Sequence, residues 1–292
     1  MANSPAWSVL TAVLLALLAG DGYGAQEKRV LVHGHRGSRG THPENTLPAF
    51  EEAIEAGAEV LELDLQLSKD GVPIIWHDFE LSPKICQKAG ATLPVAIHTL
   101  TMDEIKTFDC GSLSQSRFPD QKRIEALHLS TLDGLFQWVA GLKKAGKLNR
   151  PIQFNIETKM TGTEPADPSI FAKTAIDIIR KAGVLDSTIL QSFDFRTLVA
   201  ARKIEPKLRL SALFETKGDY CLEVKKIGAQ ILSLEFSRLT QAVVKQCHDM
   251  GIEIAPWTLN TEREWKSAIE MGVDAIITDY PRRLKTYLAT HQ

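Results

Sequence analysis

The sequence has few cysteines, and they lack the spacing of a structural zinc site. Cys86, Cys110, Cys221 and Cys247 are far apart, and none forms a Cys-x-x-Cys pair. No Gly-x-Gly-x-x-Gly motif follows the first expected strand, which argues against dinucleotide binding. The net charge is only −2 over 292 residues. We therefore expect neither nucleic acid nor an anionic membrane surface to attract the molecule as a whole.

Long apolar runs are also scarce. The run at residues 9–19 is shorter than the roughly 20 apolar residues that a transmembrane helix requires, so we expect no stable membrane span. It has the length of a signal-peptide core and is followed by mainly small or polar residues, although residues 1–8 contain no Lys or Arg. We expect residues 1–24 to be a signal peptide and the protein to be exported, either periplasmic or secreted. A disordered or docked apolar tail is the alternative.

After residue 28 the chain alternates short aliphatic runs with longer amphipathic stretches. The expected strands are residues 29–32, 60–67, 152–156, 188–190, 208–213, 231–234, 252–255 and 275–277. Residues 73–76 form a further short strand, an appendage of the second. The expected helices are residues 44–55, 132–145, 170–181, 196–204, 219–227, 239–250 and 261–271. This α/β pattern predicts one TIM-type (β/α)8 barrel over residues 25–292.

Residues 78–130 interrupt this pattern, because they are far more numerous than an ordinary connection between a strand and a helix requires. Within them, residues 100–108 are expected to form a short helix capped by Thr101, with Glu104 completing a capping box. We interpret the whole segment, about residues 78–130, as a small insertion after the second strand region. Its position predicts that it lies on the rim of the active site.

The four cysteines fall into two groups. Cys86 and Cys110 flank one irregular segment, and export would permit a disulfide between them. Cys221 and Cys247 fall within helical patterns and are interpreted as buried core residues.

Carboxylates gather at the strand ends, where barrels of this type place their active sites. Glu62 and Asp64 are two positions apart on one strand, so both project to the same face, and Glu157 ends the neighbouring strand. Buried together, they would be costly without a cation. Three oxygen donors without a thiolate suit one divalent metal, Ca²⁺ or Mg²⁺. Ion pairs with Arg36 and Lys159, or an outward orientation, are the alternatives.

Two histidines end strands beside these carboxylates. His35 follows the first strand and His77 follows the short appended strand. Cleavage of a phosphodiester needs one group to accept a proton and another to donate one, and histidine does both near neutral pH. We interpret His33, which shares a strand face with His35, as a packing residue, and His42 is a further neighbour.

Two cations suit the phosphate that such a reaction requires. Arg36 and Lys159 are adjacent to the histidine and carboxylate positions, and fixed cations stabilise charge on phosphate oxygens. The run at residues 43–46 opens the first helix, where it serves as an N-terminal cap and fixes the loop that carries His35.

Together these motifs resemble the glycerophosphodiester phosphodiesterase family over nearly the whole chain after the leader. The matching motifs are His35-Arg36-Gly37, Pro43-Glu44-Asn45-Thr46, Glu62-Leu63-Asp64, Asp70-Gly71, His77-Asp78, Glu157-Thr158-Lys159, Trp257-Thr258, Gly272-Val273-Asp274 and Thr278-Asp279-Tyr280-Pro281. Two features depart from the usual family pattern: His33-Gly34 before the first motif, and a loop at residues 38–42 that carries Arg39 and His42.

The resemblance implies a TIM-type barrel, an insertion after the His-Asp motif and a bound Ca²⁺ or Mg²⁺. It also implies hydrolysis of a small glycerophosphodiester, such as glycerophosphocholine or glycerophosphoethanolamine, to sn-glycerol 3-phosphate and an alcohol. By the same resemblance, the metal ligands are Glu62, Asp64 and Glu157, the general acid and base are His35 and His77, and the substrate contacts are Arg36, Lys159 and Trp257. It does not tell which histidine is the base, nor the oligomeric state.

Two other functions compete with this interpretation. The first is a related barrel phospholipase, sphingomyelinase D-like or phosphatidylinositol-specific. A contiguous apolar rim would indicate such an enzyme, but the apolar residues of the insertion are scattered among polar ones. A catalytically inactive barrel used as a binding module is disfavoured, because the histidines and carboxylates are all present.

Overall fold

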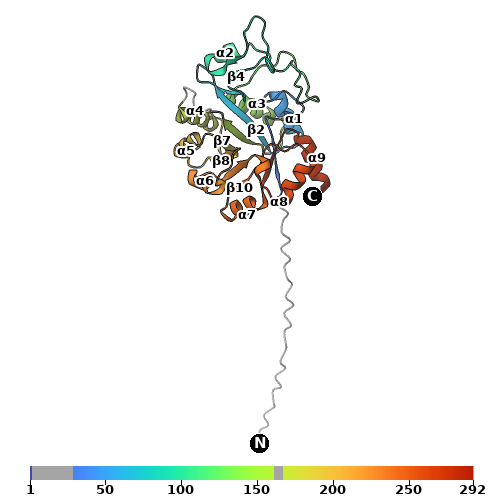
Figure 1. Ribbon diagram of the computed structural model, residues 1–292, viewed down its shortest axis with the longest axis vertical. Helices are drawn as coiled ribbons and strands as arrows, with labels where there is room; N and C mark the ends of the chain where they lie inside the picture. Colours follow the sequence, from blue (N-terminus) through green and yellow to red (C-terminus); the bar gives the residue numbers. More distant parts are fainter. Residues whose placement is uncertain (2–28, 161–166, 292) are drawn as a thin grey trace.

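The computed structural model describes residues 29–160 and 167–291, together with Met1, and its barrel agrees with the prediction (Figure 1). The predicted signal peptide lies, apart from Met1, outside the described residues. Eight parallel strands follow the order β10-β9-β8-β7-β6-β2-β1-β11. Their bounds are β1 (Leu31–Gly34), β2 (Val60–Leu67), β6 (Gln153–Thr158), β7 (Thr188–Ser192), β8 (Arg209–Phe214), β9 (Ile231–Leu234), β10 (Glu253–Ile254) and β11 (Ala275–Thr278).

The barrel is nearly closed. β1 pairs with β11, the first strand with the last, while single main-chain hydrogen bonds bridge the gap between β10 and β11. The N–H of Asp274 donates to the carbonyl of Ile254 at 3.0 Å, and that of Ile277 donates to Pro256 at 3.0 Å. Closure therefore places the ends of the first and last strands side by side.

Helices surround the strands (Figure 1). The main helices are α1 (Leu47–Glu55), α3 (Leu132–Lys144), α4 (Pro168–Lys181), α5 (Phe195–Ile204), α6 (Tyr220–Ile227), α7 (Gln241–Asp249), α8 (Glu262–Met271) and α9 (Pro281–His291), with short 3-10 turns η2 (Leu185–Ser187) and η3 (Phe236–Arg238). Their buried apolar residues pack with those of the strands in one large core. Within the residues that the structure describes, none of the helices has the length and apolar character needed to cross a bilayer.

The insertion after β2 has its own small core. β3 (Pro73–Ile75) pairs antiparallel with β2, which confirms it as an appendage of that strand. Beyond it, β4 (Glu80–Leu81) and β5 (Val95–Ala96) form a two-stranded sheet, followed by η1 (Ile97–Thr99) and α2 (Met102–Ile105). The expected capping box of Thr101 and Glu104 begins α2. In Figure 1 this segment projects on one side of the barrel.

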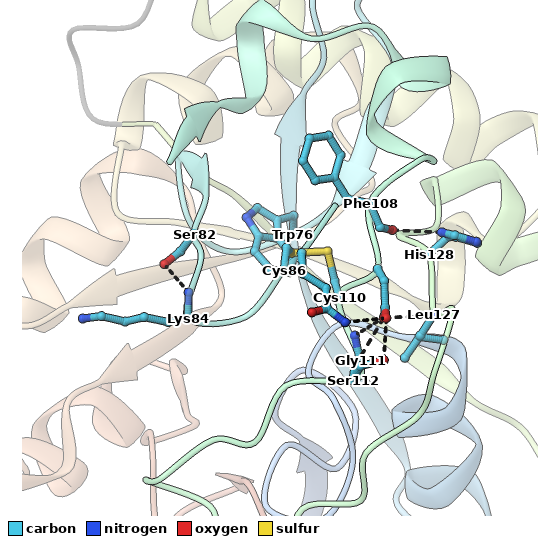
Figure 2. The surroundings of a disulfide bond; sticks show 12 residues. Trp76, Ser82, Lys84, Cys86, Phe108, Cys110, Gly111, Ser112, Leu127 and His128 are labelled. Atoms are coloured by element: carbon cyan, nitrogen blue, oxygen red, sulfur yellow. Dashed lines mark hydrogen bonds between the residues drawn. A yellow bond between two sulfur atoms is a disulfide. The ribbon is translucent and has the colours of Figure 1, made fainter. Parts of the chain in front are cut away.

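A disulfide between Cys86 and Cys110 joins two parts of the insertion, as the sequence predicted (Figure 2). Trp76 and Phe108 belong to the same buried cluster as the two cysteines. Next to the disulfide, Asp109 Oδ1 accepts a hydrogen bond from the N–H of Gly111 at 3.0 Å. The insertion is thus held by a covalent bond, an apolar cluster and hydrogen bonds within its loops.

The interpretation of Cys221 and Cys247 as plain core residues was wrong. Both are buried as expected, but they form a second disulfide, between α6 and α7. Helical periodicity predicts that a residue is buried, yet it does not predict which residue of the next helix lies opposite.

Removing either disulfide should destabilise the protein. The Cys86→Ser/Cys110→Ser and Cys221→Ser/Cys247→Ser variants each release a loop closed across a sequence separation of 24 or 26 residues. In the chain-entropy model, losing a disulfide that closes a loop of this size lowers the free energy of unfolding by about 3 kcal/mol. Denaturant unfolding of the oxidised protein measures the loss. Unfolding midpoints equal to that of the wild type would show that the cysteines are not paired.

Candidate active site

The carboxyl ends of the strands open into a cavity of about 180 Å³. Of the eight site residues predicted from the sequence, seven line this cavity, and Asp64 belongs to the carboxylate cluster beside it. The seven are His35, Arg36, Glu62, His77, Glu157, Lys159 and Trp257. The structure therefore brings all the predicted residues to one end of the barrel.

Glu62, Asp64 and Glu157 form one buried cluster, in which one oxygen from each lies within 4.8 Å of the others. Strand register explains this, because β2 pairs with β6 so that Asp64 lies beside Glu157. Glu62 points to the same face as Asp64 from two positions earlier. Gln191, at the end of β7, donates its amide to Glu62 Oε1 at 2.8 Å.

The charges of this cluster are only partly balanced. Burial, reinforced by Asp64, raises the pKa of Glu62 well above its ordinary value. Burial also raises the pKa of Glu157 to about 7, against the opposing charge of Lys159. For Asp64, burial is outweighed by the guanidinium of Arg36, with help from Lys159, and the pKa falls below its usual range. A divalent cation would favour the ionised form of all three carboxylates, and the oxygen-only donor set suits Ca²⁺ or Mg²⁺.

Backbone in the left-handed region shapes the loop next to these carboxylates. Arg36 has φ of +50°, and its N–H donates to Glu62 Oε2 at 2.8 Å. Gly37 follows with φ of +84°, and a Cβ there would lie 2.5 Å from the Ala49 carbonyl carbon, so glycine is required. The guanidinium of Arg36 donates to Glu44 Oε1 at 2.7 Å. The loop thus delivers a main-chain N–H and a cation to the cluster.

The run at residues 43–46 caps the helix and holds the loop that carries His35, as the sequence suggested, because the N–H of Asn45 donates to the carbonyl of Arg36 at 3.0 Å. The Thr46 side chain caps α1 by accepting from the N–H of Ala49. Asn45, with φ of +59°, donates its amide to Asp64 Oδ2 at 2.8 Å and accepts the Asp64 N–H at 3.3 Å. The segment that begins the helix therefore also orients a carboxylate of the cluster.

His35 is held from its Nδ1 side. Nδ1 lies 2.7 Å from Oδ1 of Asp279, the residue that follows β11. Burial alone would raise the pKa of Asp279, but His35 and Arg39 outweigh it and keep the pKa below its usual range. Burial lowers the pKa of His35 to about 4, with Arg39 adding to the effect against the charge of Asp279. The ionised Asp279 thus accepts the Nδ1 proton of a neutral imidazole, and Nε2 is the nitrogen available to a substrate.

Asp279, which the sequence placed in a matching motif without a role, is the centre of a buried network. Arg39 donates to both of its oxygens, from Nε at 2.8 Å and from Nη2 at 3.1 Å. The Asn260 amide donates to Oδ2 at 2.7 Å. These contacts fix the carboxylate that orients His35. The prediction of a closed barrel could have indicated this contact, because closure places the end of the last strand beside the end of the first.

His77 is held by a partner on each of its ring nitrogens. Its Nδ1 lies 2.6 Å from Asp78 Oδ1, and this hydrogen bond lowers the pKa of Asp78. Its Nε2 lies 3.0 Å from the Lys159 ammonium, which also pairs with Glu157 Oε1 at 2.8 Å. Because the ammonium donates and the ionised Asp78 accepts, the proton of this imidazole is on Nδ1. Lys159 links the histidine to the carboxylates.

Two aromatic rings complete the wall of the cavity. Trp257 meets Phe193 edge to face, with ring centroids 5.6 Å apart, and the Trp257 indole N–H donates to the Ser233 carbonyl at 3.2 Å. Lys159 Nζ lies 5.7 Å from the Phe193 ring centroid. Phe193 was not predicted, since it lies in a loop without a recognisable pattern.

The two remaining histidines of this region lie outside the cavity lining. His33 is buried, as the packing interpretation requires, with Nδ1 3.4 Å from the Asn155 amide. His42 is also buried, and its Nδ1 lies 3.0 Å from Thr41 Oγ1. Since neither lines the cavity, neither is placed to exchange a proton with a substrate bound there.

The mouth of this (β/α)8 barrel holds two histidines, a carboxylate cluster suited to a divalent cation and two partly buried cations. Such a site is equipped for acid–base chemistry on an anionic ester. Comparison with known proteins makes this specific. Residues 35–283 match the model of the glycerophosphoryl diester phosphodiesterase family, and the chain belongs to that family. It is accordingly a phosphoric diester hydrolase.

Individual proteins agree with this. A glycerophosphodiester phosphodiesterase from Bacillus subtilis is 28% identical over 262 residues, which cover 87% of this chain and 84% of that protein. A solved structure from Silicibacter pomeroyi, assigned to the same family, is 27% identical with a TM-score of 0.82 and covers 89% of this chain and 93% of its own. An Oleispira antarctica phosphodiesterase, solved with the product sn-glycerol 3-phosphate, has a TM-score of 0.74 at 22% identity and covers 89% and 96%. The last likeness shows the shared fold.

Proposed function

We propose that the protein hydrolyses small glycerophosphodiesters, including glycerophosphocholine and glycerophosphoethanolamine, to sn-glycerol 3-phosphate and an alcohol. The observation that carries the proposal is the meeting of His35, His77 and the three-carboxylate cluster at one cavity in a chain of this family. The product bound by the Oleispira antarctica protein supports the same chemistry.

The substrate phosphate would lie between the cationic side chains and the carboxylate cluster. Glu62, Asp64 and Glu157 would hold one Ca²⁺ or Mg²⁺, which when bound supplies positive charge to the phosphate oxygens. Arg36 and Lys159 line the same cavity and would bind the remaining oxygens. Their acidic partners hold these two side chains in place before the substrate binds. Their positive charges can therefore stabilise the negative charge that develops on the phosphate without reorganisation.

We assign the role of general base to His35. Asp279 accepts the Nδ1 proton, and the bidentate contact of Arg39 neutralises much of the charge of Asp279. The imidazole is therefore neutral, with a lone pair on Nε2 that can accept the proton of the attacking hydroxyl or water. Asp279 and Arg39 act as positioning residues in this scheme.

We assign the role of general acid to His77. Asp78 would stabilise an imidazolium through Nδ1, and Nε2 points to Lys159 inside the cavity. Once the substrate phosphate takes the Lys159 ammonium as its partner, Nε2 can take up a proton from solvent, and the resulting imidazolium can donate that proton to the leaving oxygen. Phe193 and Trp257 would cover the organic part of the substrate and exclude water.

The test is turnover of glycerophosphocholine and glycerophosphoethanolamine with added Ca²⁺ or Mg²⁺, followed by detection of sn-glycerol 3-phosphate and the free alcohol. We expect stoichiometric release of both products. Lysophosphatidylcholine and sphingomyelin in micelles are the controls for the phospholipase alternative. Hydrolysis of these lipids without hydrolysis of the water-soluble diesters would replace the proposed function by that alternative.

We further propose that the protein is exported and that its mature form begins near residue 25. The apolar run at residues 9–19 supports this, and two disulfides suit an oxidising compartment. N-terminal sequencing of the protein recovered from the periplasm or medium checks it. The proposal would be contradicted if the native protein were found inside the cell with residues 1–24 still attached.

A further inference from the structure

The insertion contributes a cation to the active-site cavity. Arg117, in the part of the insertion that follows Cys110, lines the cavity together with His77, Lys159 and Trp257. The sequence did not predict Arg117 as a site residue, because the surrounding residues show neither helical nor strand periodicity. Because it enters from the rim and not from a barrel strand, it is placed to meet the part of a substrate that extends away from the phosphate.

Arg117 differs from the other cations of the cavity in its charge balance. The other three arginine and lysine side chains that line the cavity each have an acidic partner within 3 Å. These pairs are Arg36 with Glu44 at 2.7 Å, Arg39 with Asp279 at 2.8 Å and Lys159 with Glu157 at 2.8 Å. Within residues 29–160 and 167–291, no carboxylate forms an ion pair with Arg117, whose residue is exposed. Among the described residues, Arg117 is therefore the one cation lining the cavity that has no acidic partner.

The segment that follows Arg117 is anchored. Phe118 is buried, and its ring centroid lies 4.9 Å from the guanidinium carbon of Arg39 and 5.6 Å from that of Arg117. Gln121 donates its amide to the carbonyls of Arg39 and His42, at 2.8 and 2.9 Å. The turn is thus tied to the same loop that positions His35, and Arg117 begins from a fixed place over the cavity.

The rest of the cavity offers little to a cationic alcohol. The carboxylates that line it, Glu62 and Glu157, belong to the cluster assigned to the metal. An aromatic cage for a quaternary ammonium needs open ring faces, but the Lys159 ammonium already lies 5.7 Å from the Phe193 centroid. A second cation near this wall would be repelled by Lys159 and Arg117.

We propose that Arg117 is a specificity-determining residue that favours glycerophosphodiesters whose alcohol carries a negative charge, in the simplest case a carboxylate. The proposal rests on the proposed function and names the substrate class of that same site. A guanidinium binds a carboxylate through two parallel hydrogen bonds, which a hydroxyl or ammonium group cannot accept in the same way.

Glycerophosphoserine and glycerophosphoethanolamine test this directly, because their alcohols differ by one carboxylate. The measured quantity is the ratio of kcat/KM for the serine diester to kcat/KM for the ethanolamine diester. We expect Arg117→Gln to lower this ratio about tenfold, mainly through KM, as befits one charge-assisted contact near the surface. Arg117→Lys should retain part of the preference. Arg123→Gln, at an exposed arginine of the same insertion outside the cavity lining, is the charge-matched control and should leave the ratio unchanged.

The outcomes separate this proposal from the proposed function. A ratio that Arg117→Gln leaves within twofold of the wild type, or that Arg123→Gln lowers equally, overturns the role of Arg117 while hydrolysis itself stands. Hydrolysis of neither diester by the wild type overturns both. The proposal is supported if the ratio falls in Arg117→Gln and not in Arg123→Gln. Added salt should lower the ratio of the wild type in the same way, because it screens the charge of Arg117.

Discussion

Replacing Glu62 with glutamine should lower phosphodiester hydrolysis by at least about 1,000-fold and weaken divalent-cation binding at the same time. Glutamine keeps the size of the side chain and its acceptor oxygen for Gln191, but removes the negative charge. Glu62 is buried beside Asp64 and Glu157, and these neighbours are close enough for one cation to contact all three. The loss should therefore appear in kcat as well as in metal affinity.

The experiment combines calorimetric titration with Ca²⁺ and Mg²⁺ and activity assays on protein stripped with a chelator. We expect stripping to abolish hydrolysis in the wild type and re-addition of metal to restore it. Glu253→Gln is the matched control, because Glu253 pairs with Arg209 away from the carboxylate cluster. Full activity of exhaustively stripped wild-type protein in excess chelator would show that the cluster does not act through a metal.

The barrel and the centre of its site are predictable from the sequence for one physical reason. In a parallel sheet covered by helices, strand and helix periodicities alternate, and all strands end at the same edge. Glu62, Asp64 and Glu157 could thus be placed together before their register was known. The register then brings Asp64 beside Glu157, as the prediction of one cluster requires.

The contacts that the sequence interpretation missed depend on closure and on packing between distant segments. Asp279 reaches His35 because β11 pairs with β1, and the prediction of a closed barrel already contained this neighbourhood. The α6–α7 disulfide depends on the relative rotation of two helices, which periodicity within each helix leaves open. The packing of Phe118 against Arg39 joins an irregular insertion to a barrel loop, and no local pattern indicates it.

Helix α9 was also missed, for a different reason. Its buried residues include Leu284, Tyr287 and Leu288, which follow helical spacing, but the segment is otherwise polar and near the end of the chain. It completes the ring by packing with β1 and α8. The expected helices were placed between strands, so none was assigned after the last strand.

His35→Ala and His77→Ala should each lower the maximal rate by about 10²–10⁴-fold, the usual contribution of one acid–base group. The two histidines lie in different networks. Asp279 and Arg39 hold His35, whereas Asp78 and Lys159 hold His77. Since activity needs one imidazole free and the other protonated, the wild type should show a bell-shaped dependence of rate on pH.

The roles separate when the leaving group changes. A p-nitrophenyl ester of glycerol 3-phosphate releases a phenolate that needs no proton, so the loss caused by His77→Ala should shrink strongly with this substrate. His35→Ala should remain equally impaired on both substrates, because the attacking group must still lose its proton. The control is His98→Ala, at an exposed histidine of the insertion outside the cavity. Selective rescue of His35→Ala instead would exchange the two roles, and full activity of both variants would show that neither histidine is an acid–base catalyst.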